Sequence, residues 1–219
     1  MAQLVLFGAG DIARLAHYYF THDSEHDVVA FCVDQEYRTV SEFLDLPLVS
    51  FEEVGQHYPP DAYWMFIALS YAHMNQVRAA KYAAAKARGY ELASYVSSRC
   101  TLLSQHPVGD NCFILEDNTI QPFVTIGNNI TLWSGNHIGH DSTIEDHCFI
   151  ASHVVVSGNC TVGAYSFLGV NATLSNSVRV AEHSLIGAGA VVMKDTVEKG
   201  VYLPRPAQLY AKNSDEIDL

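Results

Sequence analysis

Basic residues are scarce in this chain of 219 residues, which has 12 Lys and Arg against 24 Asp and Glu. A protein surface that binds nucleic acid needs basic side chains to neutralise the phosphates. Residues 108–197 contribute only Arg179 and Lys194 to such a surface. The shortage argues against a nucleic-acid partner.

Long apolar runs and a charged leader are also lacking. Residues 1–8 carry no charged side chain, and their apolar run, Leu4 to Phe7, is only four residues long. Signal peptides and membrane spans need longer apolar runs, so we expect neither.

Cysteine pairs of the CxxC type are absent from the sequence. The five cysteines are Cys32, Cys100, Cys112, Cys148 and Cys160. We interpret them as reduced core residues of a cytoplasmic protein.

The dominant pattern is a repeat of six residues that runs from Val108 to Val197 without insertion or deletion. Fifteen units each begin with a β-branched residue or leucine, at Val108, Ile114, Ile120, Ile126, Leu132, Ile138, Ile144, Ile150, Val156, Val162, Leu168, Leu174, Val180, Ile186 and Val192. A period of six fits neither an α-helix nor a single strand. It predicts a parallel β-helix, in which three units form one triangular coil and residues eighteen apart share a column. An ordinary β-sandwich would not keep these aliphatic residues in register.

The region in front of the repeat has a different pattern. Apolar strands are expected at 3–7, 27–33, 64–69 and 91–96, with helices at 13–19, 51–56 and 75–88. This order predicts a small parallel α/β sheet of Rossmann type. We therefore expect an α/β domain over residues 1–101, a β-helix over 102–197 and a C-terminal cap and tail over 198–219, without a flexible linker.

A glycine-rich turn follows the first expected strand. Its residues Gly8, Ala9, Gly10 and Asp11 lead into the first helix, an arrangement that brings backbone amides close to an anionic ligand. Asp34 ends the second strand and is placed to accept hydrogen bonds from a ribose or a base. A tight turn without a ligand is the alternative interpretation.

These residues resemble the bacterial hexapeptide-repeat acyltransferases that acetylate nucleotide-linked amino sugars or sialic acids. The resemblance rests on the segments Phe7 to Gly10, His140 to Asp141, Leu168 to Asn171 and Ile186 to Ala190, together with Asp34. It implies a left-handed β-helix, a homotrimer, acetyl-CoA as acyl donor and a nucleotide-sugar substrate at the N-terminal domain.

The resemblance also implies roles for individual residues. His140 is the implied general base, with Asp141 as its partner, and coenzyme contacts are implied for Phe149, Val170, Asn171 and Ala188. A carboxylate beside a histidine fixes its tautomer and stabilises the imidazolium. Because successive strand residues point to opposite faces, the two side chains meet only if the chain bends between them.

Other histidines lie nearby in the repeat. His153 shares its column with Gly135, Asn171 and Gly189, so it either contacts substrate or coenzyme or only packs. A zinc site of the γ-carbonic-anhydrase type needs another histidine two coils earlier, and none is present, so we expect no metal.

Three functions remain open from the sequence. The first is acetyl-CoA-dependent N-acetylation of a UDP- or dTDP-linked amino-deoxy sugar for surface glycan synthesis. The second is O-acetylation of a sialic-acid-like sugar, because one general base serves both acceptors. The third is a non-catalytic trimeric β-helix that acts as a scaffold or ligand sensor.

Overall fold

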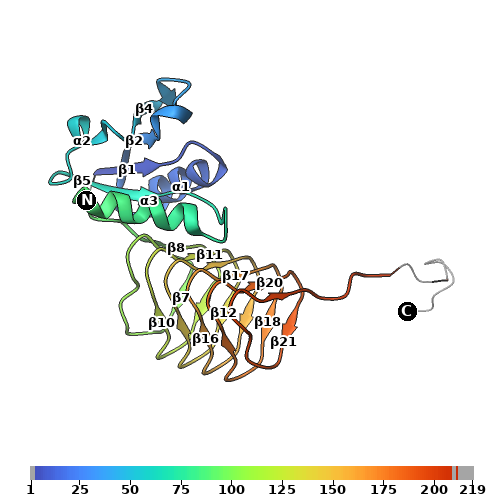
Figure 1. Ribbon diagram of the computed structural model, residues 1–219. Coiled ribbons are helices and arrows are strands. Elements are labelled where there is room, and N and C mark those ends of the chain that lie inside the picture. Colours follow the sequence, from blue (N-terminus) through green and yellow to red (C-terminus); the bar gives the residue numbers. More distant parts are fainter. Residues whose placement is uncertain (1–2, 209–210, 212–219) are drawn as a thin grey trace.

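The computed structural model describes residues 3–208 and 211, which form an α/β domain packed on one side of a long parallel β-helix (Figure 1). Five strands of the α/β domain form a sheet with the order β3-β4-β2-β1-β5. They are β1 (Gln3–Phe7), β2 (Asp27–Val33), β3 (Glu42–Phe43), β4 (Leu46–Ser50) and β5 (Tyr63–Ile67). The helices are α1 (Asp11–His22), the short 3₁₀-helix η1 (Gln35–Tyr37), α2 (Val54–His57) and α3 (Gln76–Ala87).

The parallel sheet of Rossmann type is confirmed, with two differences. The hairpin β3–β4 was not predicted; its strand β4 pairs in parallel with β2 at one side of the sheet. The strand expected at 91–96 is split between the two domains. Leu92 bridges to Met65 in the α/β sheet, whereas Tyr95 pairs with Phe113 in the β-helix.

Three parallel sheets make up the faces of the β-helix. The first sheet contains β6 (Tyr95–Val96), β8 (Phe113–Ile114), β11 (Thr131–Leu132), β14 (Phe149–Ile150), β17 (Phe167–Leu168), β20 (Leu185–Ile186) and β22 (Val201–Tyr202). The second contains β7 (Thr101–Leu102), β9 (Thr119–Ile120), β12 (His137–Ile138), β15 (Val155–Val156), β18 (Thr173–Leu174) and β21 (Val191–Val192). The third contains β10 (Thr125–Ile126), β13 (Thr143–Ile144), β16 (Thr161–Val162) and β19 (Arg179–Val180).

Strand pairing follows the predicted eighteen-residue register. Thr131 pairs with Phe149, and Ile120 pairs with Ile138. The same offset reaches back to Tyr95, before the expected domain boundary at residue 102. At the other end β22 leaves the register, because Val201 pairs with Leu185 and so adds a last strand to the first sheet.

The interior of the coils is the aliphatic column that the repeat predicts. Of the fifteen residues that begin the units, Val108 is partly buried and the others are buried. Buried polar residues between them hydrogen-bond to backbone groups at the corners. The amide of Asn118 donates to the carbonyl oxygens of Leu115 and Trp133, and its Oδ1 accepts from the N–H of Asn136. The coil interior is therefore apolar without leaving these polar groups unpaired.

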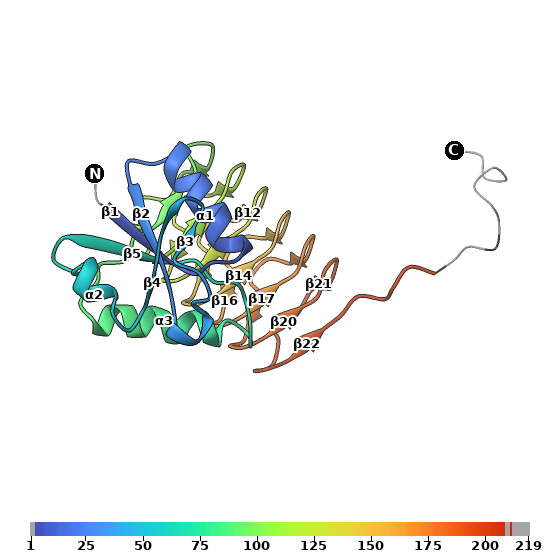
Figure 2. The same ribbon diagram turned by 90° about the horizontal axis from the view of Figure 1, so that it is seen from above.

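Helix α3 attaches the α/β domain to the β-helix and runs along one corner of the coils (Figure 2). Its Arg78 is 1% exposed and donates to Asn129 and to the carbonyl oxygens of His147 and Cys148. Burial lowers the pKa of Arg78 to about 10. Asn75, just before the helix, donates to the carbonyl oxygens of Tyr165 and Ser166. Since these acceptors belong to several coils, the helix fixes the domain along the length of the stack.

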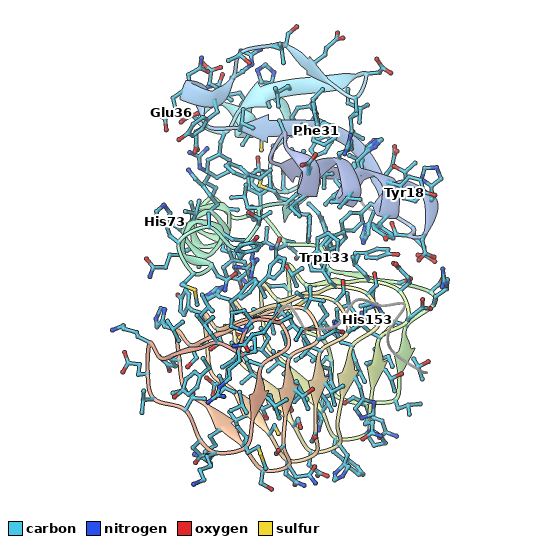
Figure 3. All side chains as sticks on the ribbon, turned by 90° about the vertical axis from the view of Figure 1, so that its right-hand side faces the viewer. Tyr18, Phe31, Glu36, His73, Trp133 and His153 are labelled. Atoms are coloured by element: carbon cyan, nitrogen blue, oxygen red, sulfur yellow. The ribbon has the colours of Figure 1, made fainter. Side chains whose placement is uncertain are left out.

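Aromatic side chains fill the rest of the contact between the domains. Phe66 of β5 packs against Phe113 of the first sheet, with ring centroids 5.5 Å apart. Tyr71 covers Phe149 and Phe167 at 4.9 and 4.8 Å. Trp133 lies at this boundary as well (Figure 3) and packs against the cluster of buried residues there. The first sheet therefore faces the α/β domain, and the other two sheets do not.

Within residues 3–208, no helix is both long and apolar enough to cross a membrane.

Candidate active site

His140 and Asp141 form a hydrogen-bonded pair at the corner between the second and third sheets. The Nδ1 of His140 lies 2.8 Å from Oδ2 of Asp141. An ionised carboxylate can only accept, so Nδ1–H donates and Nε2 remains available as a proton acceptor. The two side chains are 55% and 50% exposed, which keeps the pair open to a substrate.

A backbone bend brings the two side chains together. Asp141 has a φ of 58°, in the left-handed region that Asp tolerates, so its carboxylate turns back toward the preceding ring. The coil before this one holds the pair from below. Gln121 Oε1 accepts the His140 N–H at 2.8 Å, and the carbonyl oxygen of Pro122 accepts the Asp141 N–H at 3.3 Å.

Gly158 lies one coil after His140 and makes room for its ring. A Cβ atom on Gly158 would lie 2.7 Å from Nε2 of His140, which is inside any normal contact distance. The imidazole therefore packs against a residue that has no side chain. Neither Gln121 nor Gly158 was singled out from the sequence, although the eighteen-residue spacing puts Gly158 in the column of His140.

The His140 corner lies opposite the α/β domain. It separates the second and third sheets, whereas the first sheet carries the domain. In a triangular coil, the corner between two sides faces the third. Within one chain, His140 and the glycine-rich turn are therefore on opposite sides of the β-helix.

The glycine-rich turn borders a cavity of about 320 Å³ in the α/β domain. The lining residues come from β1, β2 and the turn, from the segment that follows β2, from the segment after β5, and from α3: Phe7, Gly8, Ala9, Val33, Asp34, Tyr37, Leu69, Val77 and Lys81. Gly8 has a φ of 128°, and a Cβ there would lie 2.8 Å from the carbonyl oxygen of Ala68. Only glycine fits that position, and the backbone can therefore border the cavity directly.

Asp34 has a fixed cationic partner in this cavity. Nζ of Lys81 lies 2.5 Å from its Oδ1 and also sits over the rings of Phe7 and Phe51. The cavity thus combines a carboxylate, an ammonium group and aromatic walls, which is a composition suited to a polar ligand with a flat ring. Lys81 was missed from the sequence because a lysine on a predicted helix gives no sign of the carboxylate it will meet.

The other two residues of the turn lie at the start of α1. Gly10 precedes the helix and is exposed, with no atom within 4 Å of the position of a Cβ. Asp11 is in the first turn of α1, where its exposed carboxylate meets Arg14 at 3.3 Å. The structure thus brings Gly8, Ala9 and Asp34 together, while Gly10 and Asp11 follow them toward solvent.

Four of the remaining candidate residues share the corner between the first and second sheets. These are His153, Val170, Asn171 and Ala188, which follow β14, β17 and β20. The ring of His153 lies against Gly135, where a Cβ would be 2.5 Å from Nδ1. Phe149 is separate: it belongs to the first sheet and is 3% exposed beneath Tyr71. Contacts of these residues with substrate or coenzyme remain predictions.

His147 belongs to a structural ladder at the corner that α3 covers. Its ring packs at a tilt of 44° against Tyr165, with centroids 4.7 Å apart, and Tyr165 stacks on His183 at 4.6 Å. Burial lowers the pKa of His147, and its Nδ1 accepts from the amide of Asn129 at 2.8 Å. Among the described residues, no group of three or more His, Cys, Asp or Glu side chains is arranged to hold a metal ion.

No family model matches this chain, and no curated protein matches it in sequence. Solved structures do match. The acetyltransferase domain of PglB from Neisseria gonorrhoeae FA1090 is 18% identical, with a TM-score of 0.81 over 94% of this chain and 100% of its own. A variant of perosamine N-acetyltransferase from Caulobacter crescentus, in complex with CoA and GDP-perosamine, is 18% identical, with a TM-score of 0.83 over 97% and 98%.

A more distant match points to the same architecture. WeeI from Acinetobacter baumannii AYE is 16% identical and has a TM-score of 0.65 over 87% of this chain and 96% of its own. At such identities the similarity establishes the fold and leaves the activity open. The chain therefore has the predicted fold, a small α/β domain followed by a left-handed β-helix.

Proposed function

We propose that this chain is an acetyl-CoA-dependent N-acetyltransferase that acts on a nucleotide-linked amino-deoxy sugar, with His140 as general base. The observation that carries the proposal is the His140–Asp141 pair, exposed at a corner of the same fold as two proteins whose names describe acetyltransferases. Cytoplasmic synthesis of a surface glycan precursor is the proposed setting. The five free thiols of the described residues suit a reducing compartment.

The chemistry of the pair supports proton transfer from an amine. Asp141 accepts the Nδ1–H of His140, which leaves the Nε2 lone pair directed away from the carboxylate. When Nε2 takes a proton, the adjacent carboxylate stabilises the imidazolium that forms. The bound donor would supply an acetyl group activated as a thioester.

The cavity beside Gly8 supports the binding of the nucleotide part of the acceptor. Its volume of about 320 Å³ is at the lower end of small-molecule sites, so it suits part of a nucleotide-sugar. Asp34 offers acceptors for ribose or base hydrogens, and Lys81 offers a positive charge next to it. In the proposed complex the sugar extends out of this cavity toward a base.

The corner between the first and second sheets suits the coenzyme. Val170 is partly exposed there, and a Cβ on Gly189 would meet no atom within 4 Å, so the surface is open. In the proposed complex Val170, Asn171 and Ala188 line the coenzyme groove mainly through backbone and shape.

A homotrimer completes the proposed site. The cavity and His140 of one chain lie on opposite sides of the β-helix, so one chain cannot bring the acceptor sugar to its own base. A neighbouring copy in a closed ring can provide the missing wall. We therefore propose that the sugar held by one copy meets His140 of another.

The direct test is acetyl transfer from acetyl-CoA to a panel of UDP-, dTDP-, GDP- and CMP-linked amino sugars, with products analysed by mass spectrometry. We expect an acetyl product that resists mild alkali, because an amide survives conditions that hydrolyse an ester. His140→Asn is expected to lower kcat by about 10²- to 10⁴-fold. The half-exposed side chain makes little contribution to the fold, so the melting temperature should change little. His137→Asn is the matched control, because His137 lies in β12 of the same coil.

Three results would contradict the proposal in different ways. An alkali-labile product would identify an O-acetyltransferase. Binding of nucleotide-sugar without turnover would favour a scaffold or sensor. Equal activity of wild type and His140→Asn would show that His140 is not the general base.

A further inference from the structure

Phe123 is an exposed aromatic residue in a strained backbone conformation. Its φ is 67°, in the left-handed region, and its side chain is 65% exposed. The other left-handed corner residues in the described β-helix are Asn, Asp, His, Ser, Gly, Tyr165 and Lys199. Phe123 alone among them has a purely hydrocarbon side chain. A bulky apolar residue is disfavoured in this conformation, and such outliers concentrate at functional sites.

Packing does not account for Phe123. Tyr165, the other aromatic residue with a six-membered ring in this conformation, packs between the rings of His147 and His183. None of the close ring pairs found among the described residues involves Phe123, and most of its ring faces solvent. The chain thus carries both a strained backbone and a mostly exposed apolar ring at this position.

The place of Phe123 links it to the proposed base. Ile120 pairs with Ile138, so Phe123 is one coil before Asp141 in the same column. Its two preceding residues hold the pair directly, since Gln121 accepts the His140 N–H and Pro122 accepts the Asp141 N–H. Neighbouring strands lie about 4.8 Å apart, so the ring is within a side chain's reach of the His140 corner.

Phe123 also lies on the side of His140 away from the residues proposed for the coenzyme. Val170, Asn171 and Ala188 all follow His140 in later coils, whereas Phe123 precedes it. If acetyl-CoA binds along the coils after His140, the coil before His140 is left free for the acceptor sugar. In the proposed complex, Phe123 is therefore on the acceptor's side of His140.

We propose that Phe123 is a specificity-determining residue that packs against the deoxygenated carbon of the acceptor sugar. This inference rests on the proposed acetyltransferase function. An aromatic ring gains by covering apolar C–H and methyl groups, whereas a hydroxyl at the same carbon would be buried against it without a hydrogen-bond partner. Phe123 thus selects a deoxy sugar over its hydroxylated counterpart and places it beside His140.

The test compares Phe123→Asn with wild type on two acceptors, a nucleotide-linked amino-deoxy sugar and the same compound with the hydroxyl restored. The preference for the deoxy sugar is its kcat/KM divided by that of the hydroxylated compound. We expect Phe123→Asn to lower this ratio by about tenfold or more, the range for losing one apolar contact. Asparagine tolerates a left-handed φ, so the melting temperature should stay the same or rise.

The matched control is Leu44→Asn. Leu44 is also an exposed apolar residue with a left-handed φ, 52°, but it lies in the β3–β4 turn of the α/β domain. It should show the same thermal effect with an unchanged ratio.

Two outcomes would overturn the inference. The first is an unchanged ratio for Phe123→Asn. The second is a smaller assembly of that variant in light scattering, because the ring would then be covered by another copy of the chain. Failure of wild type to acetylate any acceptor would instead overturn the proposed function, and this inference with it.

Discussion

The imidazole of His140 depends on a missing side chain in the next coil. An added methyl group at Gly158 would lie 2.7 Å from Nε2 and 2.8 Å from Cε1 of His140. Since these are atoms of an exposed side chain, the ring can rotate away while the coil keeps its shape. We therefore expect Gly158→Ala to lower kcat by at least tenfold while the melting temperature changes by no more than a few degrees. Steady-state kinetics and a thermal melt on the same preparation measure both effects.

Gly139→Ala provides the contrast for that prediction. A Cβ at Gly139 would lie 2.6 Å from the backbone nitrogen of Gly158 and 2.6 Å from the carbonyl carbon of Ser157. Backbone atoms in a stacked coil cannot move aside cheaply. Gly139→Ala should therefore lower the melting temperature much more than Gly158→Ala does. A large drop in melting temperature for Gly158→Ala as well would contradict the idea that Gly158 only makes room for the His140 ring.

For single residues, the sequence predicts which side chains belong to a candidate site better than it predicts which side chains they contact. The His140–Asp141 pair was expected only on condition of a bend, and the left-handed φ of Asp141 provides it. Lys81 was not predicted, because its partner Asp34 is 47 residues away in the chain. Proximity of this kind arises from the packing of α3 across the sheet, which a local pattern does not encode.

The end of α1 is tied to the start of the β-helix by one carboxylate. Oδ2 of Asp23 accepts hydrogen bonds from the Ser98 N–H at 2.9 Å, the Tyr95 hydroxyl at 2.6 Å and the Ser97 hydroxyl at 3.2 Å. These bonds, with that from Ser98 first, lower the pKa of Asp23 to about 2. Because the pKa is lower in the folded state than in the unfolded state, where it is 3.8, the ionised carboxylate stabilises the fold at pH values above 3.8. That stabilisation is lost as the pH falls toward 2.

We therefore expect Asp23→Asn to be less stable than wild type at pH 7, with a difference that shrinks as the pH falls from about 4 toward 2. Urea unfolding at a series of pH values measures it. Asp11→Asn, which removes an exposed carboxylate from the same helix, should show a much smaller difference at pH 7. A stability difference for Asp23→Asn that is constant from pH 7 to pH 3 would exclude the ionised carboxylate as its source.

Elements with a strong period were predictable, and those set by tertiary contacts were not. Fourteen of the fifteen expected column residues are buried in the coil core and Val108 packs against it, because a six-residue period has few structural solutions. The hairpin β3–β4 was missed, since its turn residues Leu44 and Asp45 carry no glycine or asparagine signal despite left-handed φ values of 52° and 62°. The strand at 91–96 was split because Leu92 and Tyr95 pair with different sheets.

At the scale of the whole molecule, a site shared between copies can be tested by mixing two defective chains. Asp34→Ala should weaken nucleotide-sugar binding and His140→Asn should slow transfer, so each variant alone is expected to have little activity. If one copy binds the sugar and another supplies the base, co-expressed chains assembled at random should regain up to about a quarter of wild-type activity per site. Light scattering on the same samples should give the mass of a trimer.

Complementation would not occur if the whole site lay within one chain, because every chain in the mixture would then carry one defect. A stable monomer in light scattering would have the same meaning. Either result would require the acceptor sugar to reach His140 around the β-helix of its own chain.

The buried guanidinium of Arg78 has a consequence for the order of folding. Its acceptors are Asn129 and the carbonyl oxygens of His147 and Cys148, which come from two successive coils. These oxygens are brought within reach of one side chain only after the coils have stacked. The α/β domain is synthesised before the β-helix, but the acceptors of Arg78 are not all in place until much of the repeat has been synthesised. We therefore expect domain docking to be a late step in the maturation of this protein, with Arg78 hydrated until then.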